Sequence, residues 1–591
     1  MNVLERNQKM QMKKWGIKVA ILCLCLGVAS TCPAKVIYVD ADAAGANDGS
    51  SWADAYNYLQ DALMFATAGD EISVAQGVYR PDEFVLSKRP NLGREETFQL
   101  KNGVTLKGGY AGFGEPDPNA RDVELYETIL SGDLDGNDVD VSDPCDLLND
   151  PTRAENSYHV VTGSGADASS GIEGFIITGG NANGGYLIRQ NNGGGMYNNG
   201  YLVGRTCPVV RNCTFTENTA ASNGGGVSNP WLSSPAFYDC TFKMNAVNEY
   251  GGGMFAAYGS NAILMNCVFR ENRSGRGSGI SIWDCAPTLT NCVITRNWAV
   301  HGGGVATGAS TATFTNCIFA NNSASKQGGG MDSYESKPVL GNCTFTGNSA
   351  LWGGGIYHES CELKSASFLI NCLFTGNSAE KGGAIYNYID TNPRMVNCTF
   401  TGNSALMGNT LACDSLDQWE PSEVQVTDCI LWDGGNEVWN NDSSDIIIRY
   451  SNVQGGWPGE DNINLDPCFA DPGYWDPNGT PADANDDFWV DGDYHLKSQG
   501  GRWDVNEGRW TIDDVTSPCI DAGDPMSPIG LEPFPNGGII NMGAYGGTAE
   551  ASKSYFGKPP CETIVAGDIN GDCAVDFKDF VVMALHWLGD G

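Results

Sequence analysis

Residues 212–227 read Asn-Cys-Thr-Phe-Thr-Glu-Asn-Thr-Ala-Ala-Ser-Asn-Gly-Gly-Gly-Val, and variants of this phrase recur along the middle of the chain. A period of 25 to 31 residues separates successive copies of its cysteine. Such a period is typical of units that cannot bury a hydrophobic face alone and therefore stack on their neighbours. The sequence thus predicts a solenoid. The repeated cysteines are Cys213, Cys240, Cys267, Cys292, Cys317, Cys343, Cys372, Cys398 and Cys429.

Each repeat alternates polar and apolar residues with the period of a β-strand. In Asn212–Thr216, Cys213 and Phe215 are expected to face one way and the threonines the other. Glycines such as Gly224 to Gly226 then suit a bend with positive φ or a close backbone approach. A second inward apolar position follows the glycines, at Val227, Met254, Ile280, Val305, Met331, Ile356 and Ile385.

Short strands without helical periodicity predict an all-β fold in which each repeat is one turn of a parallel β-solenoid. Equivalent residues would stack about 4.8 Å apart. Asparagines five residues after the cysteines would then bond their amides along the stack at a corner. Leucine-rich repeats are excluded, because their leucine spacing is absent and no segment between cysteines has a helical pattern. The asparagines are Asn218, Asn245, Asn272, Asn297, Asn322, Asn348, Asn377 and Asn403.

The stacked cysteines are interpreted as buried, unpaired thiols. In-register Cβ atoms of parallel strands stay near the strand spacing, whereas a disulfide needs them about 3.8 Å apart. The stack also holds an odd number of cysteines. Free cysteine behaves as a small buried hydrophobic residue, so the stack marks the register of the coils.

The chain is strongly acidic. It has 71 acidic and 34 basic residues among 591, which gives a formal net charge of −37. This charge argues against nucleic acid and anionic membrane surfaces as partners. It is compatible with calcium binding and with simple solubility.

Residues 1–34 are predicted to be a signal peptide. Lysines precede an apolar run at Val19–Ala29, and this run is too short to span a membrane. No later stretch has the length and polarity of a membrane span. We therefore expect a mature protein that is secreted or held on the extracellular cell surface.

Residues 35–154 are predicted to form an N-terminal cap and the first coils. A strand at Val36–Val39 leads to a helix at about Trp52–Ala66, with Ser51 as its N-cap. An uncovered solenoid end invites aggregation, which is the reason to expect a cap. Residues 69–79 resemble the opening turn of pectin-lyase-like β-helices.

The Asn-Cys-Thr-Phe-Thr-x-Asn and Gly-Gly-Gly-Ile elements of residues 155–450 resemble the repeats of polymorphic outer-membrane proteins and the wider right-handed β-helix repeat family. The resemblance implies a right-handed parallel β-helix of the pectin-lyase-like type, whereas the spacing alone does not reveal the hand. That family contains adhesins, polysaccharide lyases and proteins of unknown role. The repeats therefore specify the fold and leave the chemistry open.

Residues 451–552 lack the repeat and resemble the C-terminal region of surface β-helix proteins called choice-of-anchor domains. The resemblance rests on stretches such as residues 465–469 and 517–523. It implies last coils and a cap before an anchoring element. A disulfide between Cys468 and Cys519 is a further hypothesis.

Residues 553–591 carry the one motif with definite chemistry. Residues 568–579 read Asp-Ile-Asn-Gly-Asp-Cys-Ala-Val-Asp-Phe-Lys-Asp, which places oxygen-bearing side chains at the positions of a calcium loop. An amphipathic helix follows. The segment closely resembles one loop-helix of a type I dockerin, which implies calcium as cofactor and a cohesin-like partner. The predicted ligands are Asp568, Asn570, Asp572, Asp576, Asp579 and the backbone carbonyl of Ala574.

Two features depart from the dockerin pattern. Cys573 stands where the EF-hand type has glycine, and a single loop is evident where dockerins carry two. Docking to a cohesin therefore stays open, and an acidic solvated turn is the alternative interpretation of the loop. The acidic run from Asp133 to Asp140 is either a second cation site or a solvated insertion.

No recurring pattern specifies catalytic residues. Enzymes of the resembled fold use carboxylates that hold calcium beside a basic residue, or acidic pairs. An isolated His or Glu on a coil surface is ordinarily just solvated, so the sequence leaves it open whether the protein is an enzyme. The candidates are Asp284, His301, His358 and Glu359, near Arg270 and Arg276.

Variation in length indicates where a ligand would bind. Insertions gather in the half-turn after the inward apolar residue, around Tyr197–Arg211 and Tyr357–Leu369. Trp283 and Tyr357 lie in this half-turn of their own coils. Repeat proteins often place such insertions on their binding face. The leading interpretation is a surface protein that binds a glycan or another surface partner there. The alternatives are a polysaccharide-degrading enzyme, either a lyase or a glycoside hydrolase, and a purely structural envelope protein.

Overall fold

The computed structural model describes residues 34–87, 90–186, 189–201, 204–361, 365–415, 421–478 and 488–557, together with Val575, Phe577, Phe580 and Val581. The predicted signal peptide lies almost wholly outside these residues. All predicted calcium ligands between Asp568 and Asp579 lie outside them as well.

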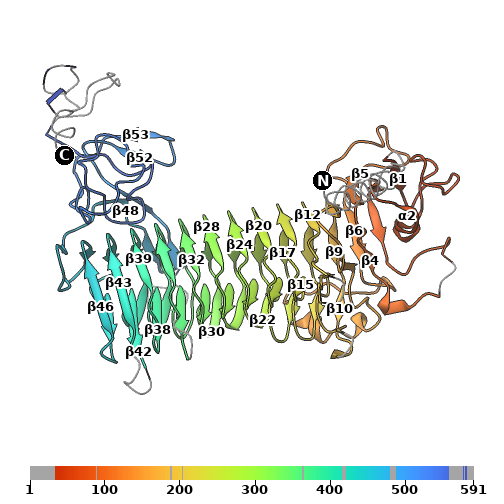
Figure 1. Cartoon of the computed structure of the whole chain (residues 1–591), viewed down its shortest axis with the longest axis horizontal. Helices are drawn as coiled ribbons and strands as arrows, with labels where there is room; N and C mark the ends of the chain where they lie inside the picture. The colour runs from red at the N-terminus through yellow and green to blue at the C-terminus, as the bar shows by residue number, and fades with distance from the viewer. Residues whose placement is uncertain are drawn as a thin grey trace, which may run out of the picture.

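The middle of the chain is a parallel β-solenoid in which each strand pairs with the equivalent strand of the next coil (Figure 1). A coil runs through sheet A, a corner at the repeated cysteine, sheet B, the asparagine corner, sheet D, the glycine corner and sheet C. The prediction of an all-β parallel solenoid is therefore confirmed.

Sheets A and B meet at the cysteine corner. The strands of sheet A are β1 (Val36–Val39), β2 (Glu71–Ala75), β5 (Thr105–Tyr110), β8 (Gly171–Glu173), β12 (Val209–Arg211), β16 (Ala236–Tyr238), β20 (Ile263–Met265), β24 (Thr288–Thr290), β28 (Thr313–Thr315), β32 (Val339–Gly341), β35 (Phe368–Ile370), β39 (Arg394–Val396), β43 (Glu423–Thr427) and β46 (Asp445–Arg449). Those of sheet B are β3 (Gly77–Tyr79), β6 (Thr128–Ser131), β9 (Ile176–Thr178), β13 (Thr214–Thr216), β17 (Thr241–Lys243), β21 (Val268–Arg270), β25 (Val293–Thr295), β29 (Ile318–Ala320), β33 (Thr344–Thr346), β36 (Leu373–Thr375), β40 (Thr399–Thr401), β44 (Ile430–Trp432) and β47 (Asn452–Val453).

Sheets C and D meet at the glycine corner. The strands of sheet C are β4 (Phe98–Gln99), β7 (Val161–Thr162), β11 (Met196–Tyr197), β15 (Val227–Pro230), β19 (Met254–Ala257), β23 (Ile280–Trp283), β27 (Val305–Gly308), β31 (Met331–Tyr334), β34 (Ile356–Glu359), β38 (Ile385–Tyr388), β42 (Leu411–Asp414) and β45 (Val438–Asn440). Those of sheet D are β10 (Asn181–Ala182), β14 (Thr219–Ala220), β18 (Ala246–Val247), β22 (Arg273–Arg276), β26 (Trp298–His301) and β30 (Ser323–Gln327), and the pair β37 (Ser378–Lys381) and β41 (Ser404–Met407) occupies the same place further along.

The core holds stacked rings and thiols. Phe345 is fully buried between Phe319 and Phe374, with ring centroids 4.3 and 4.8 Å away. The repeated cysteines are buried free thiols, as expected, but they lie at the corner and not on a strand. Cys267, for example, directs its thiol to the carbonyl oxygen of Met265 at 3.4 Å.

The asparagines form the predicted ladder at the corner after sheet B. The side-chain amide of Asn322 donates to Oδ1 of Asn348 at 3.0 Å and to the carbonyl oxygen of Ile294 at 2.8 Å. Asn297 in turn donates to Oδ1 of Asn322 at 3.0 Å. The ladder thereby satisfies buried backbone groups that a sharp corner leaves unpaired.

The glycine corner needs glycine for both predicted reasons. Gly224 has a φ of +66°, which a side chain rarely tolerates. A Cβ on Gly226 would lie 2.5 Å from the carbonyl oxygen of Gly253 in the next coil. The corner therefore keeps consecutive coils in close backbone contact.

The N-terminal segment differs in part from its prediction. Strand β1 has the expected bounds, but helix α2 begins at Leu59 and ends at Phe65. Ser51 caps no helix, because its hydroxyl bonds to Asp54 in the preceding turn. The helix packs on the first coils through Leu59 and Leu63. Three short 3₁₀ helices follow, η1 (Gly93–Glu95), η2 (Asp146–Leu148) and η3 (Pro151–Arg153).

The parallel coils of the described residues end at β46 and β47, and the next segments are not further coils. The described residues 468–478 and 488–556, here called the C-terminal lobe, lie over one side of the last coils (Figure 1). Their strands pair antiparallel as β48 (Phe469–Asp471) with β51 (Asp493–Leu496), β49 (Tyr474–Asp476) with β50 (Phe488–Val490), and β52 (Arg502–Asp504) with β53 (Arg509–Thr511).

Hydrogen bonds attach the C-terminal lobe to the coils. Both carboxylate oxygens of Asp491 accept from coil hydroxyls, those of Thr346 at 2.8 Å and Thr375 at 2.7 Å. The lobe contains both Cys468 and Cys519 as free thiols, so the structure does not have the disulfide suggested by the sequence. Cys519 instead accepts a hydrogen bond from the amide of Asn452.

Candidate functional site

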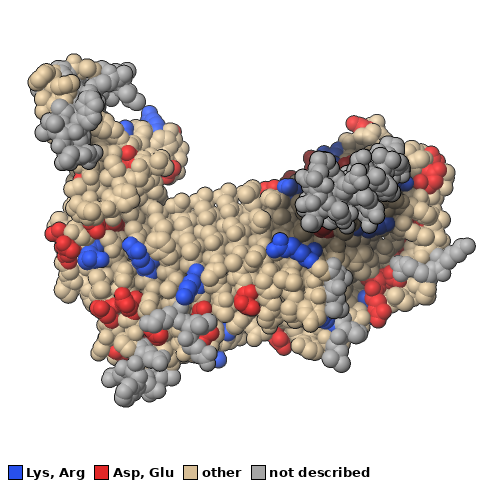
Figure 2. Space-filling view, viewed as in Figure 1, with Lys and Arg blue, Asp and Glu red and all other residues tan. Residues whose placement is uncertain are grey.

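The outer faces of the sheets differ in charge. Strands β20, β24 and β28 of sheet A present uncharged residues, and the same upper region of the coils in Figure 2 is free of charged side chains. Charged groups gather lower on the coils in this view (Figure 2). Sheets C and D contribute an ion pair between Arg276 on β22 and Asp332 on β31.

Sheet C alternates inward and outward residues, and its outward residues meet side chains from the ends of the sheet D strands. We call this line of contact along the coils the outer corner. On β31, Met331 and Ser333 face the core, whereas Asp332 and Tyr334 face the outer corner. Side chains of sheets C and D are in contact across the outer corner, so the outer faces of these two sheets are inclined toward each other.

A charged cluster occupies the centre of the outer corner. Nε and Nη2 of Arg276, at the end of β22, each lie 3.0 Å from Oδ2 of Asp332, two coils further on. Asp332 is 1% exposed, and its Oδ1 is buried without a hydrogen-bond partner. Burial raises the pKa of Asp332, and the neighbouring Arg276 opposes that rise. A buried charge pair with an unsatisfied oxygen is costly, which marks this place as a candidate site.

Glu359 lies beside this pair at the end of β34. The hydroxyl of Tyr357 donates to its Oε2 at 3.3 Å. Burial raises the pKa of Glu359, and the charge of Asp332 raises it further. Nδ1 of His301 contacts Oε1 of Gln327 nearby. Burial and then Arg276 lower the pKa of His301, so its ring is neutral at neutral pH.

An aromatic cavity of about 580 Å³ opens at the N-terminal end of the outer corner. Trp231 stacks on Tyr258 with ring centroids 5.4 Å apart, and Trp283 meets Tyr250 edge-on at 5.8 Å. Trp283 in turn approaches Tyr334 at 6.4 Å, which connects the cavity to the charged cluster. The cavity is lined by Tyr186, Arg189, Asn192, Ser222, Asn223, Pro230, Trp231, Glu249, Tyr250, Phe255, Tyr258 and Trp283.

The catalytic candidates from the sequence are only partly brought together. His301, Glu359 and Arg276 meet at the outer corner. His358 is an incorrect candidate, because it is fully buried, faces the core and bonds to Oδ1 of Asn387 at 3.0 Å. Arg270 lies on sheet B in an ion pair with Glu271, and Asp284 is exposed in the turn after β23.

Asp332 was missed by the sequence reasoning, although a signal was present. The residue after each inward apolar position of sheet C is small or aromatic in the other coils from β15 to β45. Asp332 is the one acidic residue at this position among those strands. Its partner could not be foreseen, since Arg276 precedes it by 56 residues.

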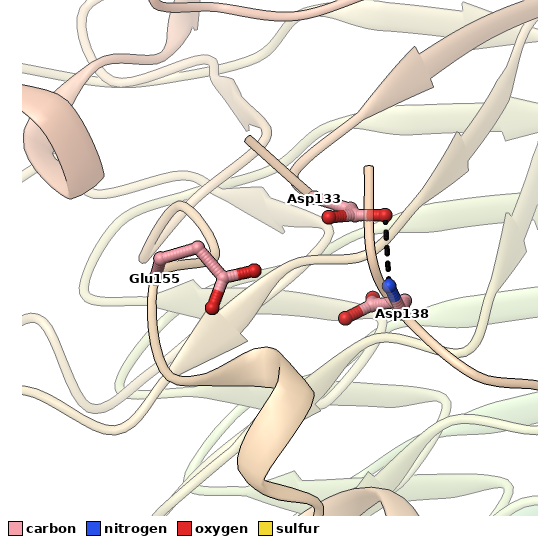
Figure 3. Close-up of side chains that lie close together, drawn as sticks. All are labelled: Asp133, Asp138 and Glu155. Carbon is pink, nitrogen blue, oxygen red and sulfur yellow. Dashed lines mark hydrogen bonds between the residues drawn. The ribbon is translucent and has the colours of Figure 1, made fainter. Parts of the chain in front are cut away.

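The acidic run after β6 forms a separate cluster. Oxygens of Asp133, Asp138 and Glu155 lie within 4.8 Å of one another (Figure 3). Arg153, which is 2% exposed, donates to Oδ2 of Asp138 at 2.9 Å, and Asn156 donates to the same oxygen at 2.8 Å. Burial raises the pKa of Asp138 to about 6.

This second cluster serves to anchor the insertion. Asp133 accepts backbone N–H groups of Gly136, Asn137 and Asp138, and the segment it folds bears η2, which packs on β14 and β18. Arg153 also reaches the carbonyl oxygen of Glu217 on a coil at 2.8 Å. The run is therefore tied to the fold through Asp133 and Asp138, which are half-buried, while Asp135, Asn137 and Asp140 are exposed to solvent.

One family model matches the region of the coils. Residues 155–319 and 241–405 each match the family model described as "Right handed beta helix region". The coils resemble right-handed β-helices. No curated protein matches the chain. A solved structure titled "Crystal structure of pectate lyase Pel9A" aligns with 88% of this chain and 97% of its own, at 11% identity and a TM-score of 0.31.

Among the described residues of this β-helix protein, no helix has the length and hydropathy needed to cross a membrane.

Proposed function

We propose that the protein is exported and binds a polysaccharide or cell-surface glycan along the outer corner of its β-helix. The aromatic cavity is the observation that carries this proposal. Tyr186, Tyr258 and Tyr201 near the cavity are 78%, 50% and 61% exposed, so their rings are available to a ligand. Aromatic rings offer an apolar face to sugar C–H groups, and tyrosine and tryptophan add a polar edge for hydroxyls. The cavity adds polar groups such as Asn192 and Glu249 to these rings, and concave sites that combine apolar and polar groups are the ordinary form of a ligand site.

Replacing Trp231 or Tyr258 by alanine should weaken glycan binding roughly 30-fold, because central aromatic anchors contribute about 2 kcal/mol or more. Glycan arrays identify the ligand, and titration calorimetry measures each variant. Tyr474→Ala is the control, since Tyr474 is similarly exposed (56%) but lies in the C-terminal lobe. Absence of binding across plant, algal and host-cell glycans would refute the proposal.

A second candidate function is cleavage of the bound polysaccharide, favoured by the charged cluster. Glu359 is half-buried in the outer corner, and its raised pKa suits a group that donates a proton to a leaving glycosidic oxygen. Burial is the main cause of this raised pKa, and the charge of Asp332 adds to it. Hydrolysis would then add water across the cleaved bond, whereas a lyase would leave an unsaturated product.

Glu359→Gln should lower the rate of cleavage by about 10²- to 10⁴-fold, the usual contribution of general acid–base catalysis, while binding persists. New reducing ends report hydrolysis, and ultraviolet absorbance reports unsaturated lyase products. Glu271→Gln on the sheet B side is the matched control. Binding without any turnover by the native protein would exclude this second function.

The C-terminal segment is proposed to bind calcium through Asp568, Asn570, Asp572, Ala574, Asp576 and Asp579, and to have a cohesin-like protein as its partner. The spacing of the oxygen ligands supports the proposal. Calcium should protect residues 553–591 of the full chain from proteolysis, and Asp568→Ala should abolish this protection. Protection that is equal with and without calcium would contradict it.

A further inference from the structure

The rings of the aromatic cavity already hold cations. The guanidinium carbon of Arg189 lies 4.3 Å from the ring centroid of Trp231 and 5.3 Å from that of Tyr201. The guanidinium carbon of Arg276 lies 5.7 Å from the centroid of Trp283. Both tryptophans of the cavity therefore have a positive group within the distance at which the ring quadrupole attracts it.

The two arginines are held differently. Arg276 is fixed by its ion pair with Asp332 at 3.0 Å. Nη1 of Arg189, by contrast, is buried without a hydrogen-bond partner. A buried N–H group without an acceptor loses its hydration, and attraction to an aromatic ring offsets this loss only in part. Arg189, whose charge also acts on Tyr197, therefore covers the face of Trp231 with one guanidinium N–H group left unsatisfied.

The surroundings also favour a positive ligand. Glu249 lines the cavity and is exposed, and Asp284 follows Trp283 in an exposed turn. The whole chain has a formal net charge of −37. Such a field concentrates cations near the surface and repels anions.

We propose that the aromatic cavity binds the ammonium group of an amino sugar, and that Arg189 competes with this ligand for the face of Trp231. The sugar part of this inference rests on the proposed glycan binding, whereas the ammonium part rests on the cavity alone. The ligand class is therefore a glycan with free amino groups, such as an oligomer of glucosamine. Its N-acetylated counterpart has the same ring but no positive charge.

The experiment compares three probes on the full chain: tetramethylammonium, glucosamine oligomers and N-acetylglucosamine oligomers of equal length. Binding is followed by tryptophan fluorescence and calorimetry at a pH where the amines are protonated. We expect the native protein to bind the glucosamine oligomer at least tenfold more tightly than the acetylated one. Trp231→Ala should lose at least tenfold in affinity for both cationic probes, and Tyr474→Ala should lose none.

Arg189→Ala gives the decisive result. Removal of the competing guanidinium should tighten binding of tetramethylammonium and of the glucosamine oligomer by about threefold or more. Arg189→Gln, which keeps most of the side-chain volume, should act in the same direction if the alanine variant folds poorly. Weaker binding in both variants would overturn the inference, because Arg189 would then be a ligand-binding group for an anion or a hydroxyl.

The outcomes separate this inference from the proposed function. Equal binding of acetylated and free amino oligomers would overturn the ammonium preference and leave glycan binding intact. Binding of tetramethylammonium without any oligomer would support the cation site and count against glycan binding. Failure of all three probes would overturn the inference, while the glycan arrays would still test the proposed function.

Discussion

Arg276→Met should lower the free energy of unfolding by about 3–5 kcal/mol at neutral pH, since it leaves a buried carboxylate without its counter-charge. Asp332 is 1% exposed, and Arg276 supplies two N–H contacts to its Oδ2 at 3.0 Å. The double variant Arg276→Met with Asp332→Asn should recover most of this loss, because it removes the charge together with its partner. Urea denaturation followed by circular dichroism measures all variants.

The loss in Arg276→Met should shrink as the pH falls. The pKa of Asp332 is raised in the folded protein, so the folded state binds a proton at a higher pH than the unfolded chain. Stability due to this proton uptake therefore grows toward acid pH and is lost as the pH rises. Arg270→Met is the control, because Arg270 is exposed and its substitution should change stability by no more than about 0.5 kcal/mol. A cost below about 1 kcal/mol for Arg276→Met would show that Asp332 carries no buried charge.

Asn322→Ala should be comparably damaging, with a loss of about 3 kcal/mol or more. Its amide bonds to Asn348 and to the carbonyl oxygen of Ile294, and its Oδ1 accepts the backbone and side-chain N–H groups of Asn297. Each buried group left unsatisfied costs about 1–3 kcal/mol. Since the damage involves two neighbouring coils, amide hydrogen exchange should accelerate first around Asn297 and Asn348.

Asn248→Ala is the matched control for the ladder. Asn248 is exposed, so its substitution should leave both unfolding and exchange near the native values. If Asn322→Ala lost as little unfolding free energy as Asn248→Ala, the asparagine ladder would set the register of the coils without adding to their stability.

Much of the fold could be predicted because its signals are local and repeated. Cys213, Phe215 and Asn218 recur with one spacing, and the structure places each in a separate ladder. Alternation every two residues identifies the side chains that face inward. Recurrence once in each coil identifies the residues that stack at the corners. The glycine corner could also be predicted from its repeated glycines, because a positive φ and a close backbone approach limit these positions to glycine.

The candidate site was harder to predict because its contacts cross coils. Arg276 and Asp332 belong to different repeats, and no period in the sequence connects them. Trp231 and Arg189 lie in irregular segments beside the coils, where no repeated pattern assigns an orientation. The expectations for helix α2 and for the antiparallel C-terminal lobe differed from the structure for a related reason. Packing on the coils overrides short local sequence patterns.

The ion pair between Arg276 and Asp332 spans two coils, from the end of β22 to β31. Duplication of the coil between them would move the two charges apart by one strand spacing, about 4.8 Å, and would separate them. The copied coil would nevertheless repeat every core contact of its parent, because repeat proteins interact only with neighbouring units. A gain or loss of one whole turn could therefore dismantle or create this centre while the scaffold stays intact, without any point substitution.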